Sequence, residues 1–126
     1  MNQRSRRTVD ESRPIFVQIA EGIENDILSG VLAEETQVPS TNEFAAYYRI
    51  NPATAGKGVN LLVDVGVLYK KRGIGMFVAE GSRATLAAKR REKFDSEFVR
   101  PLVAEAAKLG ISRTELAELI RKEETS

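Results

Sequence analysis

Residues 39–66 read PSTNEFAAYYRINPATAGKGVNLLVDVG and carry the signals for two consecutive helices. Ser40 and Glu43 have the spacing of a capping box, in which the hydroxyl accepts the glutamate backbone N–H and the carboxylate reaches back to the serine N–H. A short helix is therefore predicted directly after the serine. Asn51 is typical of an N-cap and Pro52 of a first helical position, so a second helix follows after a short turn. This spacing indicates a helix-turn-helix unit.

An earlier helix precedes this unit. Between Pro14 and Gly30, apolar residues recur at the three- and four-residue spacing of a helix with one buried stripe, at Ile15, Phe16, Ile19, Ile23, Ile27 and Leu28. Proline suits the first turn of a helix, and glycine commonly follows the last turn. We predict a helix between these two residues, followed by a connector over residues 31–38.

The segment after the second of the two consecutive helices predicts a β-hairpin. Residues 67–70 and 76–79 resemble two short strands, and the basic segment 71–75 joins them. The order of helix, short helix, turn, helix and hairpin is typical of a winged helix-turn-helix, in which the third helix enters the major groove of DNA and the hairpin, or wing, lies beside it. The predicted fold class is therefore mostly α with a small β-hairpin.

The helical pattern returns after residue 80 and predicts a surface for a second copy of the chain. Pro101 should kink or break the first tail helix, and a second capping box, Ser112 with Glu115, opens the last helix. A helical pair of this size cannot bury all of its large apolar side chains within itself. We predict a dimer interface formed by Phe94, Phe98, Leu102, Leu109, Leu116, Leu119 and Ile120.

These patterns predict three parts. Residues 1–12 form a flexible arm, residues 13–80 a winged helix-turn-helix DNA-binding domain, and residues 81–126 a helical dimerisation tail.

The composition excludes most kinds of catalysis. The sequence has no cysteine and no histidine, which removes thiolate nucleophiles, imidazole bases and the commonest metal ligands. The carboxylates are scattered along helical faces without an obvious pairing. We predict that the protein is not an enzyme and has no metal or cofactor. No apolar run approaches the roughly 18 residues of a membrane span, and no export signal is recognisable, so we expect a cytoplasmic protein without a membrane partner.

The exposed face of the third helix carries side chains suited to DNA. The net charge is only +1, so the position of the charges matters more than their sum. Ala53 and Gly56 are small enough for the helix backbone to approach base edges, and Lys57 supplies positive charge. Asn51 and Thr54 can hydrogen-bond to bases or to the DNA backbone.

The predicted tip of the hairpin is basic as well. Lys70, Lys71 and Arg72 cluster there, and Gly73 and Gly75 permit a positive φ, which a tight turn requires. Such a tip can lie on phosphate groups or enter the minor groove, whose narrow, negative regions attract arginine.

Three motifs, in order, resemble the GntR family of bacterial regulators. They are PSTNEFA at residues 39–45, INPAT at residues 50–54, and GVLY with the hairpin that follows it, at residues 66–78. The resemblance covers about residues 13–79. The short helical tail resembles that of the YtrA-like branch, and this resemblance implies that the tail serves dimerisation.

The resemblance also implies contact positions on DNA. Thr54, Lys57, Arg72 and Gly73 occupy family contact positions, whereas Asn42 stands where many members carry a DNA-contacting arginine. Asparagine lacks both the charge and the forked donor geometry of arginine. The predicted DNA-binding residues are Asn42, Arg49, Asn51, Ala53, Thr54, Lys57, Lys71, Arg72 and Gly73.

Two functions stay open. The first is a transcriptional regulator, expected to be a repressor, that binds an inverted-repeat operator in double-stranded DNA as a homodimer. If a small-molecule effector controls it, we expect that effector to act on the geometry between two wings, because the tail is too small to enclose a large metabolite. The second is a winged-helix module that docks onto proteins and does not read DNA. The basic cluster at the hairpin tip favours DNA.

Overall fold

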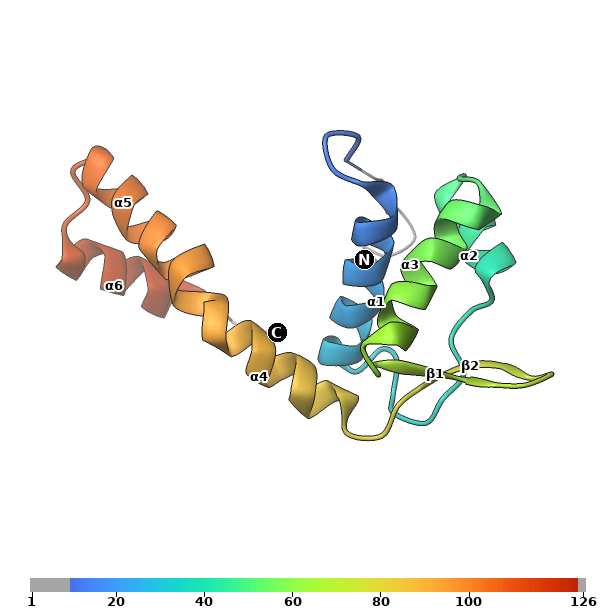
Figure 1. Ribbon diagram of the computed structural model, residues 1–126. Coiled ribbons are helices and arrows are strands. Elements are labelled where there is room, and N and C mark those ends of the chain that lie inside the picture. The colour runs from blue at the N-terminus through green and yellow to red at the C-terminus, as the bar shows by residue number, and fades with distance from the viewer. Residues whose placement is uncertain (1–9, 125–126) are drawn as a thin grey trace. The chain divides into compact units, whose positions relative to one another are not determined.

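The computed structural model describes residues 10–124, and the chain divides into two compact units at the boundary between Ala87 and Ala88 (Figure 1). The elements of the first unit are α1 (Ile15–Ser29), α2 (Thr41–Tyr48), α3 (Pro52–Asp64), β1 (Leu68–Lys71), β2 (Gly75–Val78) and the start of α4 (Ser82–Phe94). The second unit continues with a π-helical turn (Asp95–Val99), α5 (Arg100–Lys108) and α6 (Arg113–Lys122). This order confirms the predicted fold class, mostly helical with a small hairpin.

Residues 1–9 of the predicted N-terminal arm lie outside the described residues. Its described part folds back on α1. The Asp10 backbone N–H donates to the Gln18 Oε1 atom at 2.7 Å, and the Arg13 guanidinium pairs with the Glu21 carboxylate at 2.7 Å. These contacts hold residues 10–13 against the first turns of α1.

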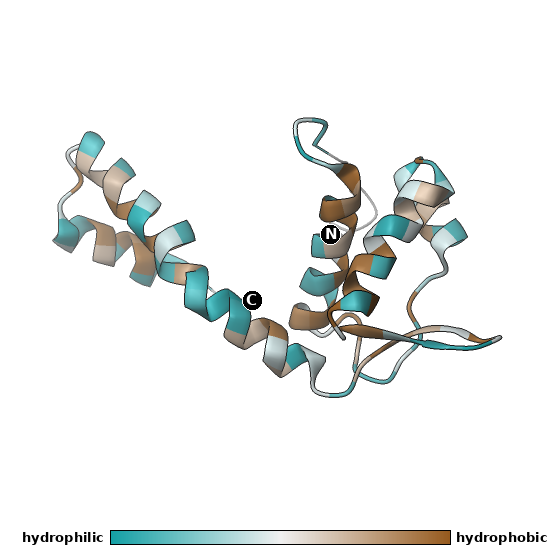
Figure 2. Ribbon diagram, viewed as in Figure 1, coloured by the Kyte–Doolittle hydropathy of each residue, from teal (hydrophilic) through white to brown (hydrophobic). Residues whose placement is uncertain are grey.

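The core of the first unit lies mainly between α1 and α3. Its buried members on these helices include Ile19, Ala20, Ile23, Ile27, Ala55, Val59 and Leu62. Apolar positions alternate with hydrophilic ones along both helices, as amphipathic packing requires (Figure 2). Gly58 lies at the closest approach, because a Cβ atom added there would lie 2.7 Å from the Phe16 carbonyl oxygen and 3.1 Å from the Ile19 Cβ atom. The absence of a side chain at Gly58 therefore sets the distance between the two helices.

The predicted caps of α2 and α3 are confirmed. The Ser40 hydroxyl accepts the Glu43 N–H at 3.1 Å, and the Glu43 carboxylate accepts the Ser40 N–H at 2.7 Å. The Asn51 side-chain oxygen accepts the Ala53 N–H at 2.7 Å at the start of α3. Between the helices, Arg49 adopts a left-handed conformation with φ +58°. Local side-chain chemistry thus accounts for both helix starts.

The hairpin is shifted by one residue from its predicted position. Its pairs run from Leu68 opposite Val78 to Lys71 opposite Gly75. The prediction that Lys71 belongs to the loop was wrong, because this residue pairs in β1 and its carbonyl accepts the Ile74 N–H at 2.9 Å to close the turn.

The connector of residues 31–38 also joins the wing, which the sequence did not predict. Gln37 forms a bridge with Phe77, and the Val38 N–H donates to the Met76 carbonyl at 2.9 Å. Val38 is buried in the core. The wing is therefore supported along β2 by a third, bridge-length segment.

Two side chains, those of Glu34 and Arg83, join the start of α4 to the rest of the first unit by hydrogen bonds. The Glu34 carboxylate accepts the backbone N–H groups of Gly81 at 2.9 Å and Arg83 at 3.1 Å. These two hydrogen bonds, first that from Gly81, lower the pKa of Glu34. The Arg83 Nε atom donates to the Leu28 carbonyl at the end of α1 at 3.2 Å, and Leu86 is buried.

The described part of the second unit is helical as far as Lys122, apart from the turn before α6. The predicted interruption by Pro101 takes the form of the π-helical turn at Asp95–Val99 rather than a break. Proline lacks the N–H for an i→i−4 bond and its ring crowds the carbonyl of the preceding turn, so the helix widens just before it. The chain then reverses between α5 and α6 (Figure 1), and Ser112 and Glu115 form the predicted capping box of α6.

Candidate nucleic-acid interface

The outer face of α3 presents small and polar residues. Ala53, Lys57 and Asn60 are exposed and Thr54 is half-buried, whereas Ala55 and Val59 on the opposite face are buried. This arrangement follows from the 3.6-residue period of the helix, which separates a core face from a solvent face. The predicted recognition face is therefore accessible along the first turns of α3.

Lys57 has a partner within the protein that the sequence did not reveal. Its ammonium nitrogen lies 4.3 Å from the centre of the Phe16 ring on α1. Such a cation–π contact is worth about 0.5–1 kcal/mol at an exposed site. The sequence pattern places Phe16 only in the apolar stripe of the first helix, and no local pattern links it to a lysine that lies far along the sequence. The contact limits the directions in which the ammonium group can point.

A shallow groove accompanies this contact on the surface of the first unit. Its lining residues come from α1 and α3 and are Phe16, Ala53, Gly56, Lys57, Asn60, Leu61 and Asp64. Three of them, Ala53, Gly56 and Lys57, belong to the predicted recognition face. The groove has an aromatic wall, small residues that permit close approach, and both a cation and a carboxylate at its edge.

Asn51 has a structural task that restricts its predicted role. Its side-chain oxygen caps α3 by accepting the Ala53 N–H. The side-chain amide N–H groups are the donors that stay available for a phosphate or a base. Asn42 on α2 and Arg49 at the end of α2 are exposed.

One face of the wing is aromatic and carries Lys71. The Tyr69 and Phe77 rings stack across the two strands at 5.9 Å between centres, and the Lys71 ammonium lies 4.3 Å from the centre of the Phe77 ring. The Tyr69 hydroxyl donates to the Glu35 carboxylate, and this hydrogen bond raises the pKa of Tyr69. The predicted contact residue Lys71 is therefore packed along the wing rather than free at its tip.

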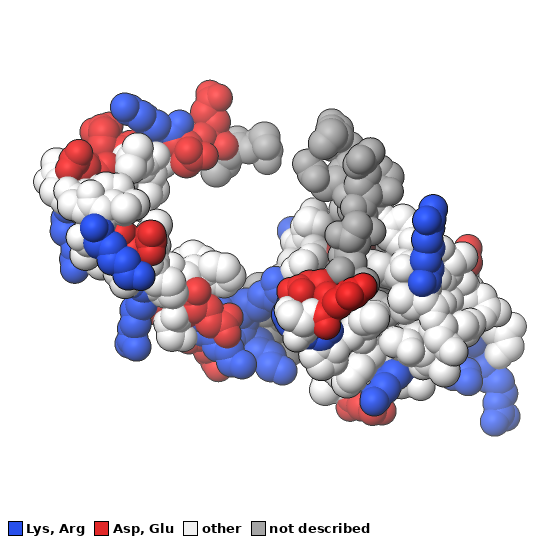
Figure 3. Space-filling view, turned by 90° about the horizontal axis from the view of Figure 1, so that it is seen from above, with Lys and Arg blue, Asp and Glu red and all other residues white. Residues whose placement is uncertain are grey.

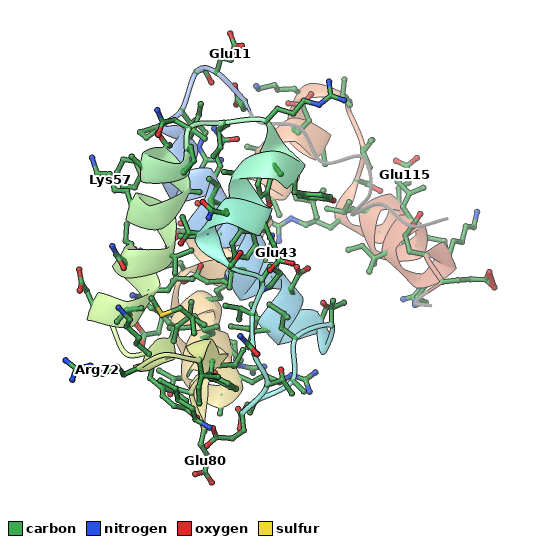
Figure 4. The ribbon with its side chains drawn as sticks, turned by 90° about the vertical axis from the view of Figure 1, so that its right-hand side faces the viewer. Glu11, Glu43, Lys57, Arg72, Glu80 and Glu115 are labelled. Atoms are coloured by element: carbon green, nitrogen blue, oxygen red, sulfur yellow. The ribbon has the colours of Figure 1, made fainter. Side chains whose placement is uncertain are left out.

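Arg72 and Gly73 form the tip itself. Both are exposed, and Gly73 has φ +78°, a conformation that favours glycine in this turn. Figure 4 shows that Arg72 and Lys57 project from the same side of the first unit, one from the wing and the other from α3. The structure thus presents two of the predicted contact residues in one direction.

On the face of the first unit that Figure 3 shows, the positive charges form no single continuous patch. Several lysine and arginine side chains there are separated by uncharged surface. Individual charge-assisted contacts to phosphates, each at its own place, fit this distribution better than one continuous basic patch.

Among residues 10–124, no group of three or more histidine, cysteine, aspartate or glutamate side chains is arranged to hold a metal ion. Within the same range, no helix has the length and apolar character needed to cross a membrane.

The residues predicted for the dimer interface lie in the second unit and the end of α4. Phe94, Phe98, Leu102, Leu109, Leu119 and Ile120 are exposed in the single chain, and Leu116 is half-buried. The Phe94 and Phe98 rings lie 5.6 Å apart between centres. Within residues 88–124, Ala106 is the one buried residue, so the described part of the second unit has little core of its own.

Comparisons with known proteins agree with this geometry. Residues 16–78 match the family described as bacterial regulatory proteins, gntR family. The HTH-type transcriptional repressor YtrA of Bacillus subtilis is 27% identical over 111 residues, which cover 88% of this chain and 85% of YtrA, so the similarity continues into the tail. A GntR family transcriptional regulator from Listeria monocytogenes has a similar structure, with a TM-score of 0.74, 25% identity, and coverage of 92% of this chain and 100% of that chain. The DNA-binding domain of AraR, solved in complex with operator ORE1, has a TM-score of 0.51 and 31% identity over 53% of this chain and 82% of that chain.

Proposed function

The chain belongs to the gntR family of bacterial regulatory proteins, and from this premise we propose that it is a transcriptional repressor that binds an operator in double-stranded DNA. The observation that carries the proposal is the common direction of Lys57 on α3 and Arg72 on the wing (Figure 4). Two relatives support it, since YtrA is a transcriptional repressor and the AraR domain was solved on its operator. The family consists of regulatory proteins, which agrees with a function other than catalysis.

In this proposal, α3 reads base edges and the wing positions the protein on the backbone. The small side chain of Ala53 lets the first turn of α3 approach the major groove, where Thr54 and Lys57 reach base edges or phosphates. Arg72 binds beside it, at phosphates or in the minor groove. Arg49 and Asn42 add contacts from α2, and that of Asn42 is neutral and therefore weaker than an arginine contact.

Salt-dependent binding tests this proposal. An operator is first isolated by pull-down of genomic fragments with the purified protein, and binding is then measured by fluorescence anisotropy at several salt concentrations. We expect Lys57→Gln to cost about 1–3 kcal/mol on the operator and less on random duplex, because a base contact is lost. Lys108→Gln, an exposed lysine of the second unit, is the matched control and should bind as the unchanged protein does. Equal losses on both DNAs would mean that Lys57 contacts phosphate rather than a base edge, and the same result for a substitution of Thr54 would remove α3 from the role of reading the sequence.

We further propose that the tail pairs two chains. The exposed apolar side chains of the second unit gain stability when a second copy covers them, at about 1.5–3 kcal/mol for each one fully buried. A symmetric pair then presents two α3 helices to an inverted-repeat operator. Phe98→Glu places a charge in the proposed interface. It should convert the dimer to a monomer in sedimentation equilibrium, whereas Lys89→Glu on the exposed surface of α4 should not.

The alternative, a winged-helix module that docks onto proteins, is separated by the same titration. Only DNA binding gives a steep dependence of affinity on salt, so a flat dependence would favour protein docking. Control by a small-molecule effector stays a prediction. We expect such an effector to change the geometry between the two wings of a dimer.

A further inference from the structure

The tip of the wing carries an apolar side chain that the proposed function does not use. Ile74 stands between two glycines, and 62% of its surface is exposed. Polar residues and glycine are usual in such turns. A single exposed apolar residue is common on protein surfaces, so exposure alone does not assign Ile74 a contact, and the way in which the backbone of this tip is held is decisive.

Hydrogen bonds support the tip from two directions. The Ile74 N–H donates to the Lys71 carbonyl at 2.9 Å, and the Ile74 carbonyl accepts from the Gln37 Nε2 atom at 3.0 Å. Both polar backbone groups of Ile74 are therefore satisfied within the protein, and the residue requires no water at its backbone. The tip can be desolvated without leaving these groups unpaired.

Gly75 completes this support. Its φ is +149°, and a Cβ atom added there would overlap the Gln37 Nε2 atom. Any side chain at Gly75 would therefore push the Gln37 amide away from the Ile74 carbonyl. Gln37 itself is held in place by its bridge with Phe77.

Arg72 identifies the surface that this tip fits. It is exposed two residues before Ile74, so the tip combines a guanidinium group with an aliphatic side chain. The minor groove of DNA offers both partners. Its narrow regions attract arginine, and isoleucine is among the apolar side chains that proteins insert into this groove, between its base steps.

We propose that Ile74 makes an apolar contact with the deoxyribose edges of the minor groove beside Arg72, and that Gln37 positions it. The inference rests on the proposed function, because it requires that the wing binds DNA. It assigns to the wing a contact that is apolar and therefore independent of counterions, in addition to the electrostatic contact of Arg72.

Affinity and its salt dependence separate the two contacts. Alanine at position 74 removes most of an aliphatic side chain, so Ile74→Ala should reduce operator affinity about five- to tenfold if DNA covers half of it. The slope of log affinity against log salt should stay unchanged, since no counterion is released by an apolar contact. Arg72→Ala should instead lower that slope by about 0.9 for each Arg72–phosphate contact that is lost. Val65→Ala, at a residue that is 59% exposed after the end of α3, is the matched control and should bind normally.

Hydroxyl-radical footprinting locates the contact, because the radical cleaves at sugars facing the minor groove. Full-length protein should protect a short run of sugars that becomes accessible with Ile74→Ala and stays protected with Val65→Ala. The melting temperature of each variant is measured in parallel, and no change is expected because both side chains are exposed.

A double-mutant cycle tests Gln37 as a positioning residue. Gln37→Ala should reduce affinity by itself, and the loss in Gln37→Ala/Ile74→Ala should be smaller than the product of the two single losses. Independent, multiplicative losses would overturn the positioning role.

The outcomes distinguish this inference from the function on which it rests. If the unchanged protein binds DNA with a steep salt slope but Ile74→Ala binds within about twofold of it, the minor-groove contact is wrong and the proposed function stands. If the unchanged protein does not bind DNA, both fail.

Discussion

Two glycines of α3 should respond to the same substitution with opposite signs. At Gly58, a Cβ atom would lie 2.7 Å from the Phe16 carbonyl oxygen and 3.1 Å from Ile19 side-chain atoms. At Gly56, the nearest atom is the Thr41 methyl carbon at 3.5 Å, an ordinary contact. The first position has no room for a methyl group, and the second has enough.

The magnitudes follow from two opposing effects. Alanine within a helix is favoured over glycine by about 0.8–1 kcal/mol. Overpacking a core costs about 1–3 kcal/mol, and here the obstacle includes a backbone atom that can move only if α1 and α3 separate. Because the backbone atom cannot move by itself, we take the upper part of this cost, about 2–3 kcal/mol. After the gain in helix propensity is subtracted, Gly58→Ala should lower the free energy of unfolding by about 1–2 kcal/mol. Gly56→Ala should raise it by up to about 1 kcal/mol.

Urea denaturation of the full chain, followed by circular dichroism, measures both values. The comparison is made at constant m-value, so that a change in midpoint reports a change in stability. If Gly58→Ala is as stable as the unchanged protein or more stable, then α1 and α3 do not approach as closely as the structure shows. If both substitutions destabilise equally, the difference in space between the two positions does not control their effects.

Three further predictions concern other parts of the first unit. Glu34→Gln should reduce stability at neutral pH and match the unchanged protein in acid, as melting temperatures between pH 7 and 3 will measure. The hydrogen bond from Gly81 lowers the pKa of Glu34 in the folded state, so the stability that it contributes is lost as the pH falls through that pKa. Ser40→Ala should cost about 1 kcal/mol in urea denaturation, since the first turn of α2 loses its cap. A chain that ends at Gly81 should melt below one that ends at Ala87, because it lacks Leu86, which is only 4% exposed in the core.

The helix boundaries could be predicted from the sequence because neighbouring residues determine them. The caps at Ser40, Asn51 and Ser112 use side chains within three residues of the groups that they satisfy. The end of α1 is also determined locally, because Gly30 adopts a left-handed conformation and its backbone N–H donates to the Ile27 carbonyl. Signals of this range are complete within a short window of sequence.

The features that could not be predicted join distant segments. The bridge between Gln37 and Phe77 and the cation–π contact of Lys57 with Phe16 each span about forty residues. The local sequence identifies neither partner, since glutamine is common in polar connectors and phenylalanine is common in the apolar stripe of a helix. The prediction for the strands failed by one residue for a different, local reason, because pairing of Lys71 with Gly75 across the hairpin, rather than propensity, places Lys71 in β1.

The stability and the proposed recognition face of α3 depend on the same contacts. Gly58 sets how closely α1 approaches α3 on the buried side, and this distance determines where the Phe16 ring lies relative to Lys57 on the exposed side. A substitution at Gly58 that separates the helices should therefore move the ring away from the ammonium group. The Lys57 side chain would then be less ordered before it meets DNA. Ordering it on binding would cost conformational entropy and so weaken the complex. Residues buried between α1 and α3 should thus alter operator affinity without touching DNA, and Gly58→Ala should weaken binding even where the protein stays folded.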